Sequence, residues 1–336
     1  MEINRVPLGL WQLRSGVGDV ARLSAMFSGV ASTRYFQIDP GRLQIDARIL
    51  RAQRALVSVT QASVGLAIDT WWDADVVGVA FDPAGSGRVQ VYGRGLGKDT
   101  MALGIGTTEM NLLLPSAYRV ATCHSTLTDV NAASEQLGLP EIPRAPRGLR
   151  IQKVGRARCA ALRKFVDEMT GDSGAIEKLL AENPRELNER IARGLAVFLA
   201  DLDTITRPIA IAAARRRAVR RITDAVSANS RRAYTLADLC GIACVSPRTL
   251  EYAFYDNFRL SPLAYVRALR LQGARHALLH RNDGAGVSEV ALEYGFTHLG
   301  KFSVDYRRMF GERPSETLRH TVGLHASSAD AMRAAA

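Results

Sequence analysis

Residues 232–258 read RAYTLADLCGIACVSPRTLEYAFYDNF, and this stretch decides the fold of the last third of the chain. Apolar residues recur at helical spacing up to a short corner at residues 244–246. A second helix is predicted to begin after Ser246, a favoured N-cap residue, with Pro247 at its first position, where the missing N–H costs nothing. Two short helices joined by a tight corner are typical of a helix-turn-helix, so we predict one here.

The same pattern recurs further along the chain. Residues 288–295 predict another short helix, Gly295 supplies its corner, and aromatic residues recur at helical spacing in the helix that follows. These aromatic residues are Phe302, Tyr306 and Phe310. A long apolar helix that begins at residues 261–262 separates the two units, so the C-terminal region is expected to be entirely helical.

These features resemble the AraC/XylS family of bacterial transcription regulators. The positions that carry the resemblance are SPRTL (246–250), Phe254, SP (261–262), RALRLQGARHALL (267–279), SEVALEYGF (288–296), FS (302–303) and FGERPSETLR (310–319). The resemblance implies a DNA-binding domain of two helix-turn-helix units joined by a long helix. It also implies promoter DNA and RNA polymerase as partners, a homodimer, and transcriptional activation.

Two departures from the family pattern have physical consequences. Cys244 stands where the first corner usually has Gly, so a positive φ there would cost about 1 kcal/mol. In the second unit Val304 replaces a common Arg, and Leu299 with Gly300 replaces a more polar pair. We therefore expect the second unit to position the protein on DNA more than it specifies the sequence.

The outward residues of the two recognition helices are the predicted DNA-binding residues. In the first helix Arg248 is expected to pair with guanine and Glu251 to accept from cytosine N4, while the tyrosines reach phosphates or thymine methyls. The predicted residues are Arg248, Thr249, Glu251, Tyr252 and Tyr255 in the first helix and His298, Leu299, Lys301, Ser303, Arg307 and Arg308 in the second. Val304 is a further outward candidate in the second helix. A basic run at residues 210–221 is either a solvated linker face or a further phosphate contact.

The charge of the 336-residue chain indicates a polyanionic partner. The formal net charge is +11, and residues 215–320 hold 18 Lys/Arg against 10 Asp/Glu, which is +8 of that excess. No apolar run is long enough to span a bilayer, the N-terminus lacks a signal-peptide pattern, and the four cysteines lack C-x-x-C spacing. These features predict a cytoplasmic protein, associated with the bacterial nucleoid, with reduced thiols.

The front of the chain has a different texture. Short apolar or alternating runs, separated by Gly, Pro and Asp clusters, predict an antiparallel sandwich or barrel. The runs are 43–50, 56–60, 65–70, 76–81, 90–92, 103–105 and 111–114. Helical patterns are expected at residues 19–27, 127–137, 152–169 and 186–206. The apolar stripes of the last two fit either an intramolecular core or the seam of a dimer.

We therefore predict an α+β chain with four parts. Residues 1–145 form a β-rich, cupin-like sensor domain for an effector, by likeness to the family. Residues 146–214 form a helical linker with a role in dimerisation, and prolines at its start mark the boundary. Residues 215–320 form the DNA-binding domain with two helix-turn-helix units. Residues 321–336 form a disordered tail.

Several tempting sites fail on their spacing. Residues 93–99 lack the glycine spacing and the Ser/Thr of a phosphate-binding P-loop, and instead predict a glycine-rich hairpin. His276 and His280 lie one helical turn apart, but no third metal ligand is near in sequence. Cys123 and His124 are neighbours on a predicted strand, so their side chains point to opposite faces and do not form a nucleophile–base pair.

Trp71 and Trp72 are the predicted effector-binding residues, and they either line a pocket or cap the end of the barrel. No catalytic residue, metal site or cofactor is predicted. The expected function is that of an effector-responsive transcription regulator, not an enzyme, that reads two successive major grooves. The alternatives are a sensor-enzyme or DNA-repair type protein with an appended AraC-type domain, and a regulator controlled by a protein partner.

Overall fold

The computed structural model describes residues 8–15, 23–24, 26–27, 31–106, 108–144, 147–171, 174–200, 202, 213–280 and 284–319. Its internal contacts divide the chain into two compact units. The first unit comprises Met1–Tyr35 and Gln44–Ala210, and the second comprises Phe36–Leu43 and Ile211–Ala336. Among the described residues, no helix combines the length and the apolarity that a membrane crossing requires.

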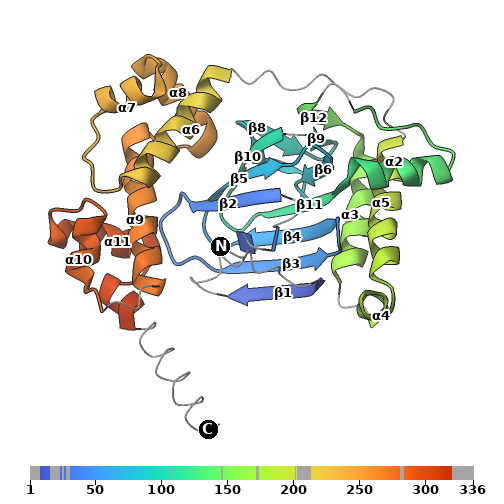
Figure 1. Cartoon of the computed structure of the whole chain (residues 1–336), viewed down its shortest axis with the longest axis horizontal. Coiled ribbons are helices and arrows are strands. Elements are labelled where there is room, and N and C mark those ends of the chain that lie inside the picture. The colour runs from blue at the N-terminus through green and yellow to red at the C-terminus, as the bar shows by residue number, and fades with distance from the viewer. Residues whose placement is uncertain are drawn as a thin grey trace, which may run out of the picture. The chain divides into compact units, whose positions relative to one another are not determined.

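Two sheets form the body of the first unit (Figure 1). Within the described residues, the larger sheet has the order β1 (Gly9–Ser15), β3 (Ile45–Arg51), β4 (Leu56–Ala62), β11 (Arg119–Thr126), β6 (Val76–Phe81), β9 (Thr100–Ile105) and β12 (Gly148–Lys153). The smaller sheet has the order β2 (Ala31–Gln37), β5 (Leu66–Trp72), β10 (Thr108–Leu114), β7 (Ser86–Val91) and β8 (Arg94–Gly97). The predicted runs fall on β3 to β7, β9 and β10, which confirms the β-rich front half.

The two sheets face each other across a packed interior that depends on glycine. The Trp72 ring of β5 meets the larger sheet at Gly104 of β9, where an added Cβ would lie 1.7 Å from the ring. Beside it, the His124 ring lies edge-on to Trp72, with ring centroids 4.9 Å apart, and covers Gly78 of β6. Large rings on one strand therefore fill the space that glycines leave open on another.

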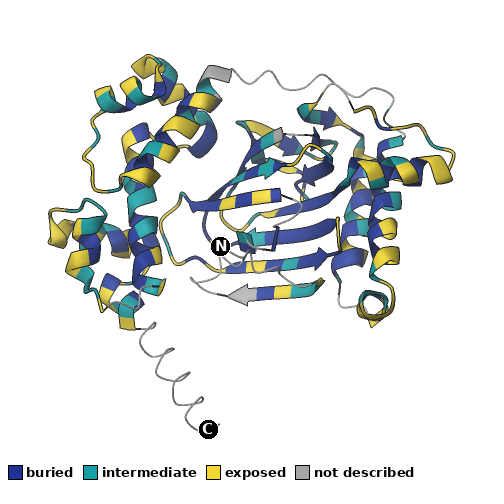
Figure 2. Cartoon of the chain, in the orientation of Figure 1, coloured by how far each residue is buried: buried dark blue, intermediate teal, exposed yellow. Residues whose placement is uncertain are grey.

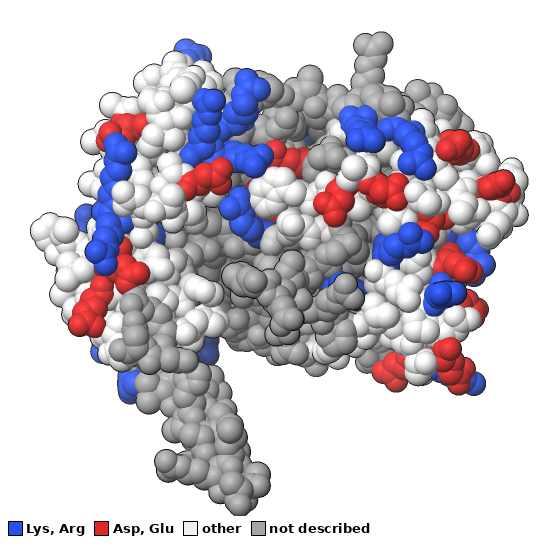
Figure 3. All heavy atoms as spheres, in the orientation of Figure 1, with Lys and Arg blue, Asp and Glu red and all other residues white. Residues whose placement is uncertain are grey.

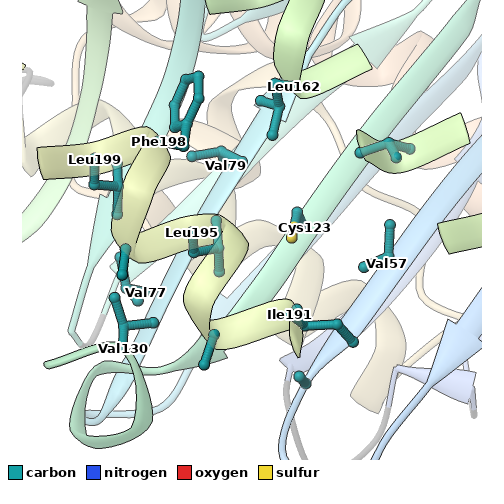
Figure 4. Close-up of a cluster of buried hydrophobic side chains, with 14 of the residues drawn as sticks. Val57, Val77, Val79, Cys123, Val130, Leu162, Ile191, Leu195, Phe198 and Leu199 are labelled. Atoms are coloured by element: carbon teal, nitrogen blue, oxygen red, sulfur yellow. The ribbon is translucent and has the colours of Figure 1, made fainter. Parts of the chain in front are cut away.

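Helices cover the other face of the larger sheet. They are α2 (Leu127–Gln136), α3 (Arg156–Thr170), α4 (Gly174–Glu182) and α5 (Pro184–Ala200). Figure 4 shows Ile191 and Leu195 of α5 pointing toward Cys123 and its neighbours on the sheet. Cys123 therefore faces the helices while His124 faces the interior between the sheets, which confirms that the two side chains point to opposite faces.

One predicted helix begins later than the sequence pattern indicates. The helix predicted at residues 152–169 is preceded by strand β12, and α3 begins only at Arg156. Pairing with β9, in which Gln152 lies opposite Met101, takes the start of the pattern into the sheet. The helix predicted at 186–206 is α5, and its predicted end lies outside the described residues, as does most of the helix predicted at 19–27.

The second unit is helical. Its helices are α6 (Ala213–Ala228), α7 (Leu236–Ala243), α8 (Pro247–Phe258), α9 (Pro262–His280), α10 (Val287–Glu293) and α11 (Leu299–Phe310). The long helix α9 contacts both α7 with α8 and α10 with α11, so it joins two helix pairs as predicted (Figure 1). Near the first pair, the rings of Phe254, Phe258 and Tyr265 form one buried cluster.

A short segment from the front of the chain, Phe36–Leu43, is part of this helical unit. The Phe36 ring stacks on Tyr265 of α9, with ring centroids 4.7 Å apart. The Gln37 side chain donates a hydrogen bond to the Met309 carbonyl at 2.7 Å, and the Gly41 amide donates to the same carbonyl at 3.0 Å. The segment therefore contacts both the first helix pair and the end of α11.

Candidate nucleic-acid interface

The first helix pair is held by local capping interactions. The Thr235 hydroxyl accepts from the Asp238 amide at 3.1 Å, and the Asp238 carboxylate accepts from the Thr235 amide at 2.8 Å, which is a capping box at the start of α7. The corner residue Cys244 has φ 55° and ψ 44°, which is the left-handed conformation expected at a position where the family usually has Gly. The Ser246 hydroxyl then caps α8 by accepting from the Thr249 amide at 3.2 Å, with Pro247 at the first position.

Helix α8 has one buried face and one exposed face (Figure 2). Leu250, Phe254 and Phe258 are fully buried and anchor the helix to the unit. The opposite face is solvent-accessible, with Tyr252 at 46% and Tyr255 at 56% exposure. Arg248 and Glu251 are also exposed, and Thr249 is half-buried beneath its cap. All five predicted residues of α8 therefore lie outside the core.

Two guanidinium groups flank Tyr252 on the exposed face of α8, one from α8 itself and one from the neighbouring helix α6. The Tyr252 ring has the Arg248 guanidinium at 5.6 Å and the Arg215 guanidinium of α6 at 5.7 Å from its centroid. Arg215 is held there by an ion pair with Asp256 at 3.0 Å. Figure 3 shows Lys and Arg side chains gathered where α6 runs. The basic run at 210–221 thus contributes at least one cation directly beside the recognition helix.

The second helix pair uses a glycine where the first uses a cysteine. The Gly295 corner has φ 78°, and a Cβ added there would lie 3.0 Å from the carbonyl oxygens of Ser230 and Arg231. No side chain other than hydrogen fits this corner without a backbone shift. The following helix α11 buries the predicted residues Phe302, Tyr306 and Phe310.

The outer face of α11 is cationic with an apolar centre. Lys301, Arg307 and Arg308 are exposed, and so is His298 at the N-cap, while Ser303 is half-buried. Two apolar residues are exposed as well, namely Leu299 at 39% and Val304 at 68%. The six predicted residues of this helix pair thus lie at the surface, and their setting is more apolar than that of α8.

A buried ion pair fixes the end of α11 against α9. The Arg275 guanidinium lies 2.9 Å from a Glu312 oxygen and 4.3 Å from the centre of the Phe310 ring. The Thr317 hydroxyl donates to the same Glu312 oxygen and accepts from the Tyr306 hydroxyl at 2.9 Å. Burial lowers the pKa of Arg275 and raises the pKa of Tyr306. This packed network sets the orientation of the second recognition helix.

An open groove of about 240 Å³ lies between α9 and the start of α11. It is smaller than the clefts of about 300 Å³ or more that hold drug-sized ligands. Among its cations, Arg267 is paired with Asp305 and Arg270 donates to the Arg232 carbonyl. Lys301 at its rim has no ion-pair partner within the described part of the chain.

Trp71 and Trp72, the predicted effector residues, are not brought together. Trp72 is 2% exposed and packs in the interior against His124, whereas Trp71 lies on the other side of β5 with the Arg34 guanidinium 4.5 Å from its ring. The hairpin predicted at residues 93–99 is formed by β7 and β8, with Tyr92 and Gly93 at positive φ in its turn.

Two of the rejected sites can also be placed. The His276 and His280 rings stack 4.2 Å apart, and the described residues contain no group of three or more side chains able to hold a metal ion. Burial raises the pKa of the Cys123 thiol and lowers the pKa of His124 to about 3, so both groups are neutral at pH 7.

The supporting residues that sequence analysis did not identify contact the recognition helices or α9 from elements distant in the sequence. In the sequence Arg215 is one of several arginines in the basic run at residues 210–221. Its position beside Tyr252 depends on how α6 packs against α8. Phe36 and Gln37 lie more than 200 positions before their partners in α9 and α11. Neither has a local signal, since their sequence surroundings are those of a β-strand.

The comparisons with known proteins agree with this geometry. Residues 239–320 match the family described as "Helix-turn-helix domain". The "XylDLEGF operon transcriptional activator 2" of Pseudomonas putida is 37% identical over 99 residues, which are 29% of this chain and 63% of that protein. The "Probable thc operon regulatory protein" of Rhodococcus erythropolis is 34% identical over 102 residues, 30% of this chain and 31% of that protein.

Two solved structures are also similar to this chain. A probable AraC family transcriptional regulator from Rhodopseudomonas palustris is 38% identical, covers 31% of this chain and 96% of that chain, and has a TM-score of 0.29. ToxT from Vibrio cholerae is 13% identical, covers 88% of this chain and 99% of that chain, and has a TM-score of 0.31.

The fold and the sequence match of residues 239–320 define a helix-turn-helix domain. Through this domain the chain belongs to the AraC/XylS family, as its motifs predicted. The aligned region spans less than two thirds of the length of the curated relatives, namely 63% of the first and 31% of the next two.

Proposed function

We propose that this chain is a sequence-specific DNA-binding transcription regulator that places α8 and α11 in two successive major grooves. The observation that carries the proposal is the division of both helices into a buried face and an exposed face rich in cations and hydrogen-bonding groups. A helix of this kind, held by its apolar face, presents its outer side chains to base edges and phosphates. The net charge of +11 favours the same partner.

The finer parts of the proposal concern regulation. Several relatives are named transcriptional activators, which supports activation through contact with RNA polymerase. We place effector sensing in the β-rich first unit, dimerisation on its helices, and the protein in the cytoplasm with the nucleoid. A thermal-shift screen with small metabolites tests the sensing step, because a ligand that binds the folded state raises its stability. A screen without any stabilising compound favours control by a protein partner.

The direct test is selection of bound sequences from a random duplex library with the full chain. We expect a motif with two elements about one helical turn apart, the spacing of adjacent major grooves. Failure to enrich any sequence would overturn the proposal and would favour the alternative of an enzyme with an appended domain.

Replacement of Arg248 tests the role of α8 in this motif. Arg248→Ala should cost about 1–3 kcal/mol of binding free energy and relax the preference at one base pair. Arg193→Ala is the matched control, because Arg193 is a partly exposed cation of α5 in the first unit, paired with Glu189. A loss for Arg248→Ala that is equal for all sequences would make Arg248 a phosphate contact instead.

A further inference from the structure

The two recognition helices have the same length but differ in surface chemistry at two corresponding positions. Both α8 and α11 contain 12 residues and bury an aromatic residue at the eighth and at the last position. Position by position, Arg248 of α8 therefore corresponds to Gly300 of α11, and Tyr252 corresponds to Val304. At these two positions the exposed face of α8 carries a guanidinium group and an aromatic hydroxyl. The exposed face of α11 carries no side chain at the first position and an isopropyl group at the second.

Val304 is the most exposed large apolar side chain among the described residues, at 68%. It lies opposite the buried stripe of α11. Successive residues of an α-helix are about 100° apart, so Phe302 and Tyr306, each two residues from Val304, lie about 160° around the helix from it. β-branched residues lower helix propensity by about 0.5 kcal/mol relative to Ala. Val304 therefore neither supports the core nor favours the helix in which it stands.

Gly300, one turn earlier, is equally unexplained by packing. A Cβ added to Gly300 would meet no heavy atom within 4 Å, so the fold has room for any small side chain there. Gly300 and Val304 thus stand i, i+4 on the outer face of α11, and together they form a site with no side chain at the first position and an exposed isopropyl group at the second.

The surroundings of this site indicate what it contacts. Lys301, Arg307 and Arg308 flank Val304 on the exposed face of α11. A protein partner would be expected to cover a broad apolar surface, whereas the exposed apolar groups of α11 are only Leu299 and Val304, and three cations flank Val304. A major groove has the complementary arrangement, with phosphates on both sides and, at each A·T pair, the thymine C5-methyl group in the middle.

We propose that Val304 reads a thymine methyl group and that Gly300 lets the helix backbone approach the base closely enough for this contact. The proposal rests on the DNA-binding function proposed above and specifies which chemical groups of the bases each helix pair contacts. The first unit reads donors and acceptors with Arg248 and Glu251, and the second reads a methyl group. The second helix pair therefore specifies sequence, contrary to the expectation that it mainly positions the protein.

The test uses the full chain and the duplex that it selects from a random library. Each thymine in the half-site of the second helix pair is replaced in turn by deoxyuridine, which lacks only the methyl group. At one position we expect Kd to rise about three- to fivefold, the value of one buried methyl group. In Val304→Ala the same replacement should change Kd by less than half of that factor. Leu292→Ala, with another exposed apolar residue of the unit, is the matched control and should keep the full effect.

The outcomes separate the two proposals. If the chain selects no sequence, the DNA-binding function itself fails. If it selects a sequence but deoxyuridine has no effect at any position, or has the same effect in Val304→Ala, the methyl-reading inference is overturned while the function stands. If Val304→Ala keeps both affinity and thymine discrimination but loses activation in a purified transcription assay, the site binds a protein instead, and the inference is equally overturned.

Discussion

At the scale of single residues, the corner of the first helix pair has a non-glycine residue at positive φ, which strains the backbone. Cys244 adopts the left-handed conformation with φ 55°, and its exposed thiol donates a hydrogen bond to the Gly241 carbonyl at 3.5 Å. The second pair has Gly295 at its corner, with φ 78°. Both corners require a positive φ, which glycine adopts without steric cost. The strain at Cys244 therefore comes from its Cβ atom.

Cys244→Gly should therefore raise the free energy of unfolding by about 0.5–1 kcal/mol, because relief of the left-handed strain exceeds the extra entropy of glycine in the unfolded chain. Cys240→Gly, inside α7, is the control and should lower it by a similar amount. Urea unfolding of the full chain measures both. An unchanged or lower stability for Cys244→Gly would show that the cysteine is strain-free.

His124 predicts how the first unit responds to acid. Its pKa is lowered to about 3 by burial, against about 6.5 in an unfolded chain. Below pH 6.5 the unfolded chain binds a proton that the folded chain does not, so stability falls as the pH falls from 6.5 to 3. The slope from this group approaches about 1.4 kcal/mol per pH unit.

His124→Leu should remove this contribution, since leucine does not titrate and neither ring nitrogen of His124 has a hydrogen-bond partner within the described residues. The measurement is urea unfolding of both proteins from pH 7 to pH 4, followed by the near-ultraviolet signal of the tryptophans. The difference in stability between wild type and variant should shift in favour of the variant as the pH falls. A constant difference would contradict the buried, neutral state of His124.

At the scale of elements, the packing of β5 on β9 depends on the absence of a side chain. Gly104→Ala should lower the free energy of unfolding by about 1–3 kcal/mol, because the new methyl group would overlap the Trp72 ring and force it from its place. Gly97→Ala in β8 is the matched control, since a Cβ there makes only ordinary contact at 3.5 Å. Thermal unfolding followed by tryptophan fluorescence measures the change, and equal effects of the two substitutions would contradict this packing.

How far the elements could be predicted depends on whether their signals are local. Helices α7, α8 and α11 follow from apolar spacing, caps and corners within a dozen residues, and the exposed faces of the recognition helices follow with them. Strand β12 and helix α3 could not be separated, since the helical pattern begins inside residues that pair with distant β9. The place of Phe36 against Tyr265 has no signal within reach of a sequence window.

At the scale of the whole molecule, chemistry is divided between the two units. In the first unit two titratable groups, Cys123 and His124, are buried and neutral at pH 7. The second unit carries most of the net charge, with +8 of +11 between residues 215 and 320. This distribution predicts electrostatic attraction to a polyanion through one part of the chain.

The most direct measurement of the central claim is the affinity of the full chain for a selected duplex as a function of salt. If α6, α8 and α11 neutralise phosphates, log K should fall linearly with log salt and drop by about 10³-fold or more between 50 and 200 mM. A scrambled duplex should bind at least about 10³-fold more weakly at the same salt. A flat salt dependence, or equal affinity for both duplexes, would contradict the account.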